Sequence, residues 1–136
     1  MDKKRSNCPL SCSLDLFGDK WSLLIIRDLM MKGKVSYSEF LISEEKIATN
    51  ILANRLKLLE EEKIVTKEVS PTNKSKFEYS LTEKGSDLLP VLVEMGSWSI
   101  KYNESTKTSA LGQRIANKKN KFLKEVAKKL KERLKN

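Results

Sequence analysis

The most informative pattern of apolar and polar positions lies in residues 47–85. Two short β-like runs, 64–70 and 77–81, are joined there by the basic turn Pro-Thr-Asn-Lys-Ser-Lys. A helix, a strand, a basic turn and a second strand in this order predict a winged helix-turn-helix. The helix is indicated by four apolar residues at helical spacing that leave one face polar: Ile47, Leu52, Leu56 and Leu59.

Two helices are predicted near the start of the chain. The first begins at Pro9, because proline fits a first helical turn, and Gly18 ends it. Residues 21–31 are apolar almost all round, which is typical of a buried central helix. Asp19 is a suitable N-cap for this second helix, and Gly33 closes it.

A capping box marks the start of the next helix. The Ser36 hydroxyl can accept from a backbone N–H three residues on, while the Glu39 side chain can reach back. This short helix is expected to run to residue 41 or 42, and residues 43–46 form the turn before a helix over 48–62. The pair forms the helix-turn-helix, and Val35 is expected to form a very short strand.

A further helix and a tail follow the two strands. Thr82 is expected to cap a helix with an apolar series that extends to Ile100. Pro90 should kink this helix or mark a break near its start. Residues 103–109 are a linker by composition, and residues 111–134 predict an amphipathic helix with apolar positions spaced by four or seven.

These elements define a mainly α fold with a small β-hairpin. At 136 residues the chain is long enough for one domain with a single core, and most of the apolar residues lie before Tyr102. We expect a flexible N-terminus over 1–7 and a winged helix-turn-helix DNA-binding domain over 8–102. A linker and a basic amphipathic helix are expected over 103–136.

The positive charge of the chain is concentrated at its C-terminal end. The formal net charge is +9, but residues 1–110 carry 17 Lys/Arg against 16 Asp/Glu, while residues 111–136 carry 10 against 2. Individual lysines, and not the overall charge, must therefore support nucleic-acid binding. The tail helix has four possible roles: a solvated helix, an extra DNA contact, a membrane-surface helix, or a helix that packs on a partner subunit. Its apolar stripe favours the last of these.

Several kinds of chemistry are excluded by composition. The chain has no histidine, which removes histidine-based acid–base catalysis, metal sites and nucleophile pairs. Two cysteines cannot form a four-thiolate metal site, and no glycine-rich phosphate loop is present. We therefore expect no enzyme, metal or cofactor. No long apolar run or secretory signal is found, which indicates a cytoplasmic protein without a membrane segment.

The polar face of the helix over 48–62 is the candidate for base contacts. Asparagine can pair with adenine through two hydrogen bonds, and Thr or Ala can contact a thymine methyl group, so A·T-containing sites are indicated. A solvated helix face is the alternative. Arg55 either contacts a phosphate or pairs with Glu39 or Asp28 to brace the motif. The candidate residues for base contacts are Thr49, Asn50, Ala53, Asn54 and Lys57.

Two further groups are candidates for backbone contacts. Ser36, Tyr37 and Ser38 lie at a helix N-terminus, where free N–H groups and hydroxyls suit a phosphate, although Tyr37 fits a core position equally well. At the tip of the wing, two cations and a hydroxyl can meet phosphates or the minor groove, which would make binding dependent on salt. These wing residues are Lys74, Ser75 and Lys76.

Several motifs over residues 8–102 closely resemble the HxlR-type bacterial transcriptional regulators. The resemblance implies a homodimeric winged-helix repressor or activator whose dimer forms through the N-terminal and post-wing helices, with the N-terminal cysteine, here Cys8, sensing oxidants or electrophiles in some members. Ala48 departs from the family, which usually has a capping Ser or Thr there; Thr49 could replace it. The motifs are Cys8-Pro9-Leu10, Leu14-Asp15-Leu16-Phe17-Gly18-Asp19-Lys20-Trp21, Ile47, Leu52, Arg55-Leu56, Leu59-Glu60, Glu78-Tyr79-Ser80-Leu81-Thr82 and Gly85.

A dimer would read double-stranded DNA as a palindromic operator, because a two-fold axis supplies a second recognition helix. The post-wing helix has more apolar surface than a small winged domain covers, and the expected interface residues are Leu10, Leu14, Leu92, Met95 and Trp98.

The cysteines have two explanations. A helix N-terminus and nearby cations favour the Cys8 thiolate, and Cys12 one turn later is poorly placed for a bond to it, so a sensing disulfide would join two subunits. Alternatively, both cysteines are small buried residues at a dimer contact. A regulator controlled by a small-molecule ligand, and a winged-helix protein-interaction module, remain the alternatives for function.

Overall fold

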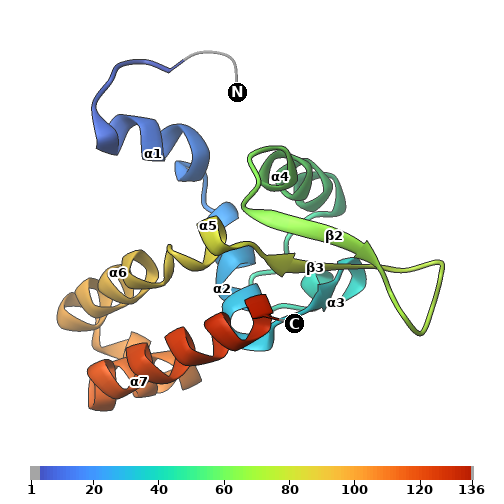
Figure 1. Ribbon diagram of the computed structural model, residues 1–136. Helices are drawn as coiled ribbons and strands as arrows, with labels where there is room; N and C mark the ends of the chain where they lie inside the picture. Colours follow the sequence, from blue (N-terminus) through green and yellow to red (C-terminus); the bar gives the residue numbers. More distant parts are fainter. Residues whose placement is uncertain (1–3, 136) are drawn as a thin grey trace.

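The computed structural model describes residues 4–135, and Figure 1 shows a mainly helical molecule with a small sheet and a projecting wing. Part of the segment 1–7, expected to be flexible, therefore lies outside the described residues. The elements are α1 (Pro9–Phe17), α2 (Ser22–Lys32), β1 (Val35–Ser36), α3 (Tyr37–Leu41), α4 (Thr49–Glu61), β2 (Val65–Val69), β3 (Phe77–Leu81), α5 (Glu83–Ser86), α6 (Leu89–Tyr102), the 3₁₀ helix η1 (Glu104–Thr108) and α7 (Ala110–Lys135).

The sheet confirms the predicted hairpin and the short strand at Val35. Its three strands are antiparallel in the order β1-β3-β2, with Val35 opposite Tyr79 and Val65 opposite Leu81. The side chains of these four residues are buried on the face of the sheet that meets the helices. Because side chains alternate along a strand, the other face carries polar residues, and the hairpin extends outward as the wing.

Local hydrogen bonds explain where the helices start. The N-cap position of α2 is Trp21 and not Asp19 as predicted, but the Asp19 carboxylate still caps the start of the helix by accepting from the backbone N–H groups of Trp21 and Ser22, both at 2.9 Å. The capping box between Ser36 and Glu39 is also present. Thr82 caps α5 by accepting from the backbone N–H of Gly85.

Two proposals about helix ends are decided by the structure. Helix α4 begins at Thr49 with Ala48 as its N-cap residue and no side-chain cap, so the suggestion that Thr49 replaces the missing cap is wrong. Pro90 lies in the first turn of α6, where its missing N–H costs no helical bond. The proline therefore marks the break between α5 and α6 and does not kink a continuous helix.

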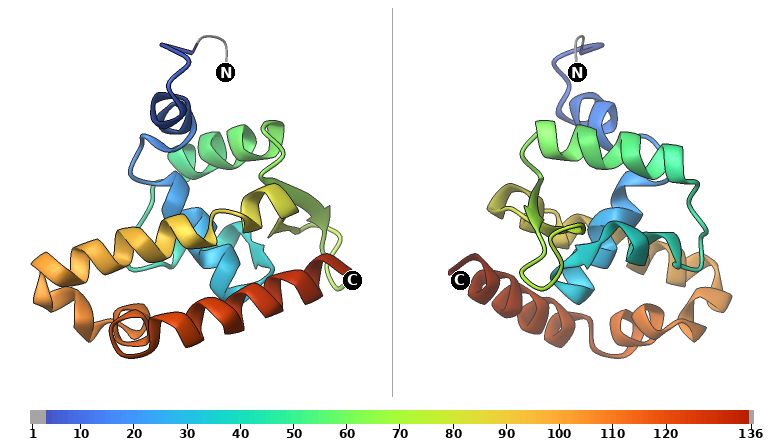
Figure 2. Two further views of the ribbon diagram at one scale, coloured as in Figure 1. Left: turned by 60° about the vertical axis from the view of Figure 1, so that its left-hand side comes forward. Right: turned by 90° about the vertical axis from the view of Figure 1, so that its right-hand side faces the viewer.

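The core is built around α2. Ile26 and Leu29 on this helix are almost fully buried, together with Leu52 and Leu59 of α4 and Phe40 of α3. Helix α6 packs beside α2, as the two views of Figure 2 show. The central helix predicted over residues 21–31 is thus confirmed.

Helix α7 closes the same core. Its residues Ile115, Phe122, Val126 and Leu130 are each no more than 5 % exposed and belong to the main hydrophobic cluster. The apolar stripe that we expected to pack on a partner subunit is therefore buried against its own chain, because α2 and α6 leave an apolar surface that it covers. The segment 103–109, expected to be a linker, contains η1, which contacts both α6 and α7.

Two features adapt α7 to this position. The helix is interrupted at Lys118, whose φ of −147° and ψ of 55° are not helical. Near its end, Arg133 Nη1 donates to the carbonyl oxygens of Met30 at 2.9 Å and Leu29 at 3.5 Å. The bond to Met30 satisfies a carbonyl group in the last turn of α2, whereas the Leu29 carbonyl also accepts from the backbone N–H of Gly33, whose φ is +90°. The tail is therefore fixed to the central helix.

The helices within residues 4–135 include none that is both long and apolar enough to cross a membrane. Within the same residues, no group of three or more Cys, Asp or Glu side chains could hold a metal ion.

Candidate nucleic-acid interface

Helix α4 has two clearly different faces. Leu52, Leu56 and Leu59 are buried, and Leu52 and Leu59 have no exposed surface. The opposite face is open to solvent near the start of the helix, which is the geometry that a helix needs to enter a groove. All five candidates for base contacts lie on this exposed face: Thr49, Asn50, Ala53, Asn54 and Lys57.

The position of α4 is fixed by a contact that the sequence did not indicate. The Tyr37 hydroxyl, on α3, donates to the carbonyl oxygen of Thr49 at 2.8 Å. Tyr37 is partly buried and packs against the hydrophobic core, so it has in part the core role that was one of its two expected roles. Its ring holds α3 against the first turn of α4, and the recognition helix is thereby set at a defined angle.

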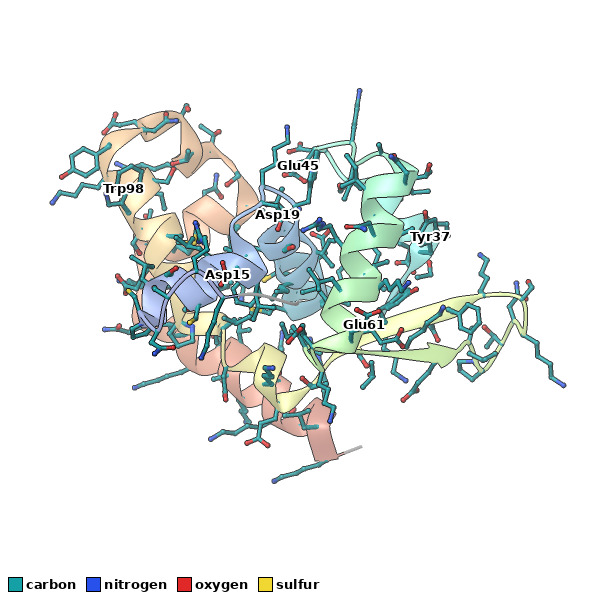
Figure 3. The ribbon with its side chains drawn as sticks, turned by 90° about the horizontal axis from the view of Figure 1, so that it is seen from above. Asp15, Asp19, Tyr37, Glu45, Glu61 and Trp98 are labelled. Carbon is teal, nitrogen blue, oxygen red and sulfur yellow. The ribbon has the colours of Figure 1, made fainter. Side chains whose placement is uncertain are left out.

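Arg55 braces the motif through a different partner from those expected. Its Nη1 lies 3.5 Å from Asp19 Oδ1, and its Nη2 donates to Asn54 Oδ1 at 2.8 Å. The expected partners are engaged elsewhere, since Glu39 bonds to Ser36 and Asp28 pairs with Arg27. Figure 3 shows Asp19 between α1 and α4, so this pair links the recognition helix to the segment that joins α1 and α2.

The environment of Asp19 favours its charged form. Burial acts to raise its pKa, but hydrogen bonds from the Ser22 hydroxyl and from the backbone N–H groups of Trp21 and Ser22, together with Arg55, hold the pKa below its ordinary value. The charged carboxylate therefore serves as helix cap and ion-pair partner together.

Replacing Asp19 by asparagine should cost less than about 1 kcal/mol of unfolding free energy, because asparagine is also a good N-cap and a partly exposed ion pair contributes little. Alanine removes the cap as well and should cost about 1–2 kcal/mol. Urea unfolding of Asp19→Asn, Asp19→Ala and Arg55→Ala, alone and combined, measures both contributions.

The wild type should lose the stability that the Asp19 carboxylate contributes as the pH falls below about 4, because the pKa of Asp19 is lower in the folded than in the unfolded protein. Equal losses for the two Asp19 variants would contradict this account.

A second brace was missed by the sequence analysis. The Arg27 guanidinium binds both carboxylate oxygens of Glu45 at 2.9 Å and also contacts Asp28. The hydrogen bonds from Arg27 lower the pKa of Glu45 to about 2. Since Glu45 lies in the turn between α3 and α4, this pair fixes the turn to α2. In the sequence, the acidic residue Glu45 within the turn was the only sign of this ion pair.

The candidates for backbone contacts fall into two groups. Ser36 is 7 % exposed and its hydroxyl donates to Glu39 Oε1 at 2.9 Å, which argues against a direct phosphate contact by this hydroxyl. Ser38 is exposed. On the wing, Lys74, Ser75 and Lys76 are all exposed, as predicted, although the Ser75 hydroxyl donates to Asn73 Oδ1 at 2.6 Å and so shapes the loop.

A separate apolar surface lies on α1 and α6. Leu10 and Leu14 are exposed on α1, and Met95 and Trp98 are exposed on α6, with Trp98 68 % accessible. Figure 3 places Trp98 and Tyr37 on opposite sides of the molecule. Leu92, expected at the same surface, is partly buried and packs against the core. Helix α7 covers another side of α6 and leaves these side chains open.

The cysteines lie at the start of α1. Cys8 is exposed and directly precedes the helix, whereas Cys12 is partly buried and its thiol donates to the carbonyl oxygen of Ser6 at 3.3 Å. Both are free thiols.

An exposed polar face on the second helix of a helix-turn-helix, with a basic wing beside it, defines a winged-helix DNA-binding transcriptional regulator. The family model for HxlR-like helix-turn-helix proteins matches residues 16–107, and the chain belongs to this family. The resemblance found in the sequence is thereby confirmed.

Two proteins of Bacillus subtilis are similar to this chain in sequence. The HTH-type transcriptional regulator YodB of Bacillus subtilis is 37 % identical over 98 residues, which are 71 % of this chain and 87 % of YodB. The uncharacterized HTH-type transcriptional regulator YdeP of the same organism is 36 % identical over 97 residues, which are 71 % of this chain and 75 % of YdeP.

Solved structures show the same fold. Reduced YodB has a TM-score of 0.60 at 36 % identity and covers 74 % of this chain and 98 % of its own. The redox regulator HypR in its oxidized form has a TM-score of 0.63 at 34 % identity, covering 71 % and 98 %. YodB has also been solved bound to quinone and after diamide treatment.

Proposed function

We propose that this chain is a homodimeric repressor that binds a palindromic operator through α4 and regulates that binding through Cys8. The observation that carries the proposal is the exposed polar face of α4, where Asn50 forms no hydrogen bond through its side chain with the described residues. An unpaired amide on an exposed recognition helix is suited to the paired donor and acceptor of an adenine edge.

Backbone contacts would hold the helix in the groove. The first turn of α4 has no side-chain cap at Ala48, so its backbone N–H groups are free to meet a phosphate. Lys74 and Lys76 on the wing form no ion pair with the described residues. They extend the contact along the duplex, beyond the bases that α4 reaches.

The exposed side chains of α1 and α6 support the dimer. Leu10, Leu14, Met95 and Trp98 are all more than 40 % exposed, which is costly for large apolar side chains grouped on two helices. A second copy of the chain would bury them and would place a second α4 at a fixed distance, which a palindromic site requires.

Gel-shift and footprinting experiments with the DNA upstream of the chain's own gene test the operator. We expect a discrete complex that resists unrelated competitor DNA and protects two symmetric half-sites, about one helical turn or a multiple of it apart. Sedimentation of the free protein should give a dimer, and Trp98→Glu should give a monomer. A monomeric wild type, or binding that competitor DNA removes completely, would refute the proposal.

Removal of the wing charges should change the salt dependence of operator binding. Each neutralised phosphate contributes about −0.9 to the slope of log K against log salt, so Lys74→Gln with Lys76→Gln should make the slope less steep by about 2. Fluorescence anisotropy titrations at salt concentrations between about 50 and 200 mM measure this slope. Lys84→Gln is the control, since the Lys84 amine donates to the Glu62 carbonyl oxygen. An unchanged slope in the double variant would place the wing away from DNA.

Oxidation of Cys8 is expected to weaken operator binding. In the proposed reaction, Cys8 and a cysteine of the partner subunit lose two protons and two electrons to an oxidant such as diamide or a quinone, and a disulfide forms between the subunits. Cys8 is exposed, and the similar regulators YodB and HypR have been solved in reduced and oxidant-treated or oxidized forms. The disulfide would move α1 and, through it, the spacing of the two recognition helices.

Cys8→Ser should keep operator affinity and lose its sensitivity to diamide, measured by gel shift with a non-reducing gel in parallel. Cys12→Ser shows which cysteine of the partner subunit takes part, because this variant keeps its sensitivity only if the disulfide joins two Cys8 residues. If diamide released Cys8→Ser from DNA as readily as the wild type, Cys8 would not be the sensor.

A further inference from the structure

Helix α7 presents a straight row of lysines to solvent. Lys124, Lys128, Lys131 and Lys135 are exposed and follow one another at intervals of four, three and four residues, which places them on one face of the helix. Lys121 precedes them by three residues on the same face. With a rise of about 1.5 Å per residue, this lysine row, 121–135, is about 21 Å long.

The charges of the lysine row are mostly unpaired. Lys121 lies 3.8 Å from Glu125, but the other four form no ion pair with any residue of the described segment 4–135. By contrast, Lys119 on another side of the helix pairs with Glu94. The row is held rigidly, because the buried stripe of Phe122, Val126 and Leu130 and the bonds of Arg133 fix α7 to the core.

The inward direction of that stripe argues against a membrane as the partner. An amphipathic helix binds a bilayer by inserting its apolar face, but the apolar face of α7 is occupied by α2 and α6. What remains outside is the row of positive charge, with Leu134 near the end of the helix as an exposed large apolar side chain beside it. Such a row fits a regularly charged polyanion, and a phosphate backbone is the partner that a DNA-binding protein meets at high local concentration.

The position of α7 decides which DNA it can reach. In Figures 1 and 2, α4 and α7 lie on opposite sides of the molecule. Since α7 packs on the core with its buried stripe, the lysine row faces away from α4. A straight duplex bound by α4 therefore lies out of reach of the row.

We propose that the lysine row of α7 is a second, sequence-independent DNA-backbone surface that holds another duplex segment while α4 binds the operator. This inference depends on the proposed function only because it takes α4 as the helix that binds the operator. Helix α7 lies outside residues 16–107, which the family model matches, so this surface is additional to the shared helix-turn-helix. A protein with DNA surfaces on two sides could join separate DNA segments.

A capture experiment tests the proposal. The upstream operator duplex is immobilised, loaded with protein and washed, and a labelled duplex of unrelated sequence is then added. The wild type should capture the labelled duplex, and capture should fall steeply with salt. The variant Lys124→Gln/Lys128→Gln/Lys131→Gln should load onto the operator as the wild type does. Its capture should drop at least about tenfold at low salt, and the salt slope should become less steep by about 3.

Two matched variants show whether the position of the charge matters. Lys124→Arg/Lys128→Arg/Lys131→Arg keeps the charge and should keep capture. Lys4→Gln/Lys63→Gln/Lys107→Gln removes the same charge elsewhere and should also keep it. All substituted lysines are exposed, so thermal unfolding should change little.

Unchanged capture by the glutamine variant, or no capture by an operator-bound wild type, would overturn the proposal. Lysine-row-dependent binding to phosphatidylglycerol vesicles without duplex capture would also overturn it, in favour of a membrane. Failure of the protein to load onto the operator would instead count against the proposed function, so the two failures can be told apart.

Discussion

Replacing Asn50 by alanine is expected to reduce the operator's advantage over unrelated DNA at each of the two half-sites. An asparagine that pairs with adenine through two hydrogen bonds contributes about 1–3 kcal/mol of discrimination, which is roughly 5- to 150-fold in affinity. Asn50 lies in the first turn of α4, is exposed and bonds to no other described side chain. Competition titrations with operator and unrelated duplexes give the specificity ratio directly.

The effect should be confined to specific binding. Asn50 carries no charge, so affinity for unrelated DNA and its salt slope should stay as in the wild type. Stability should not fall, because alanine has the higher helix propensity. Glu61→Ala, at the far end of the same exposed helix, is the control and should leave the specificity ratio unchanged. A loss of affinity that is equal for both duplexes would show that Asn50 does not read bases.

Replacing Phe122 by alanine should destabilise the whole domain. Phe122 is 3 % exposed, lies in the main cluster and has the Arg114 guanidinium 4.6 Å from its ring centre. Removing a buried phenylalanine side chain costs about 3–5 kcal/mol, which is a large part of the stability of a small domain. Urea unfolding followed by circular dichroism measures the loss.

The control for Phe122 is Lys129→Ala, an exposed substitution on the same helix that should change the unfolding free energy by less than about 0.5 kcal/mol. A single unfolding transition in both proteins is expected, since α7 and α2 share one core. If Phe122→Ala only loosened the tail and left the rest of the domain at wild-type stability, α7 would be an appendage and not part of the fold.

The sequence predicted those features that depend on near neighbours. The capping box at Ser36, the cap at Asp19, the hairpin and the break at Pro90 each follow from a few adjacent residues. The exposed face of α4 followed from the spacing of its apolar side chains, because a regular helix converts spacing into direction.

Contacts between distant segments were harder to predict. Arg55 had several carboxylates of suitable charge, and only the packing of α1 and α4 brings Asp19 to it. The bidentate pair of Arg27 and Glu45 was missed for the same reason. The stripe on α7 was recognised as apolar, but periodicity shows that a face is buried and not which molecule buries it.

Trp98 gives the molecule an optical reporter of its own. The chain has two tryptophans; Trp21 is half-buried under Lys20, whereas the Trp98 indole is largely in water beside Tyr102. Pairing of subunits through α6 would remove that indole from water and shift its emission toward the blue. Fluorescence of the unlabelled protein could therefore follow association and dissociation as they happen.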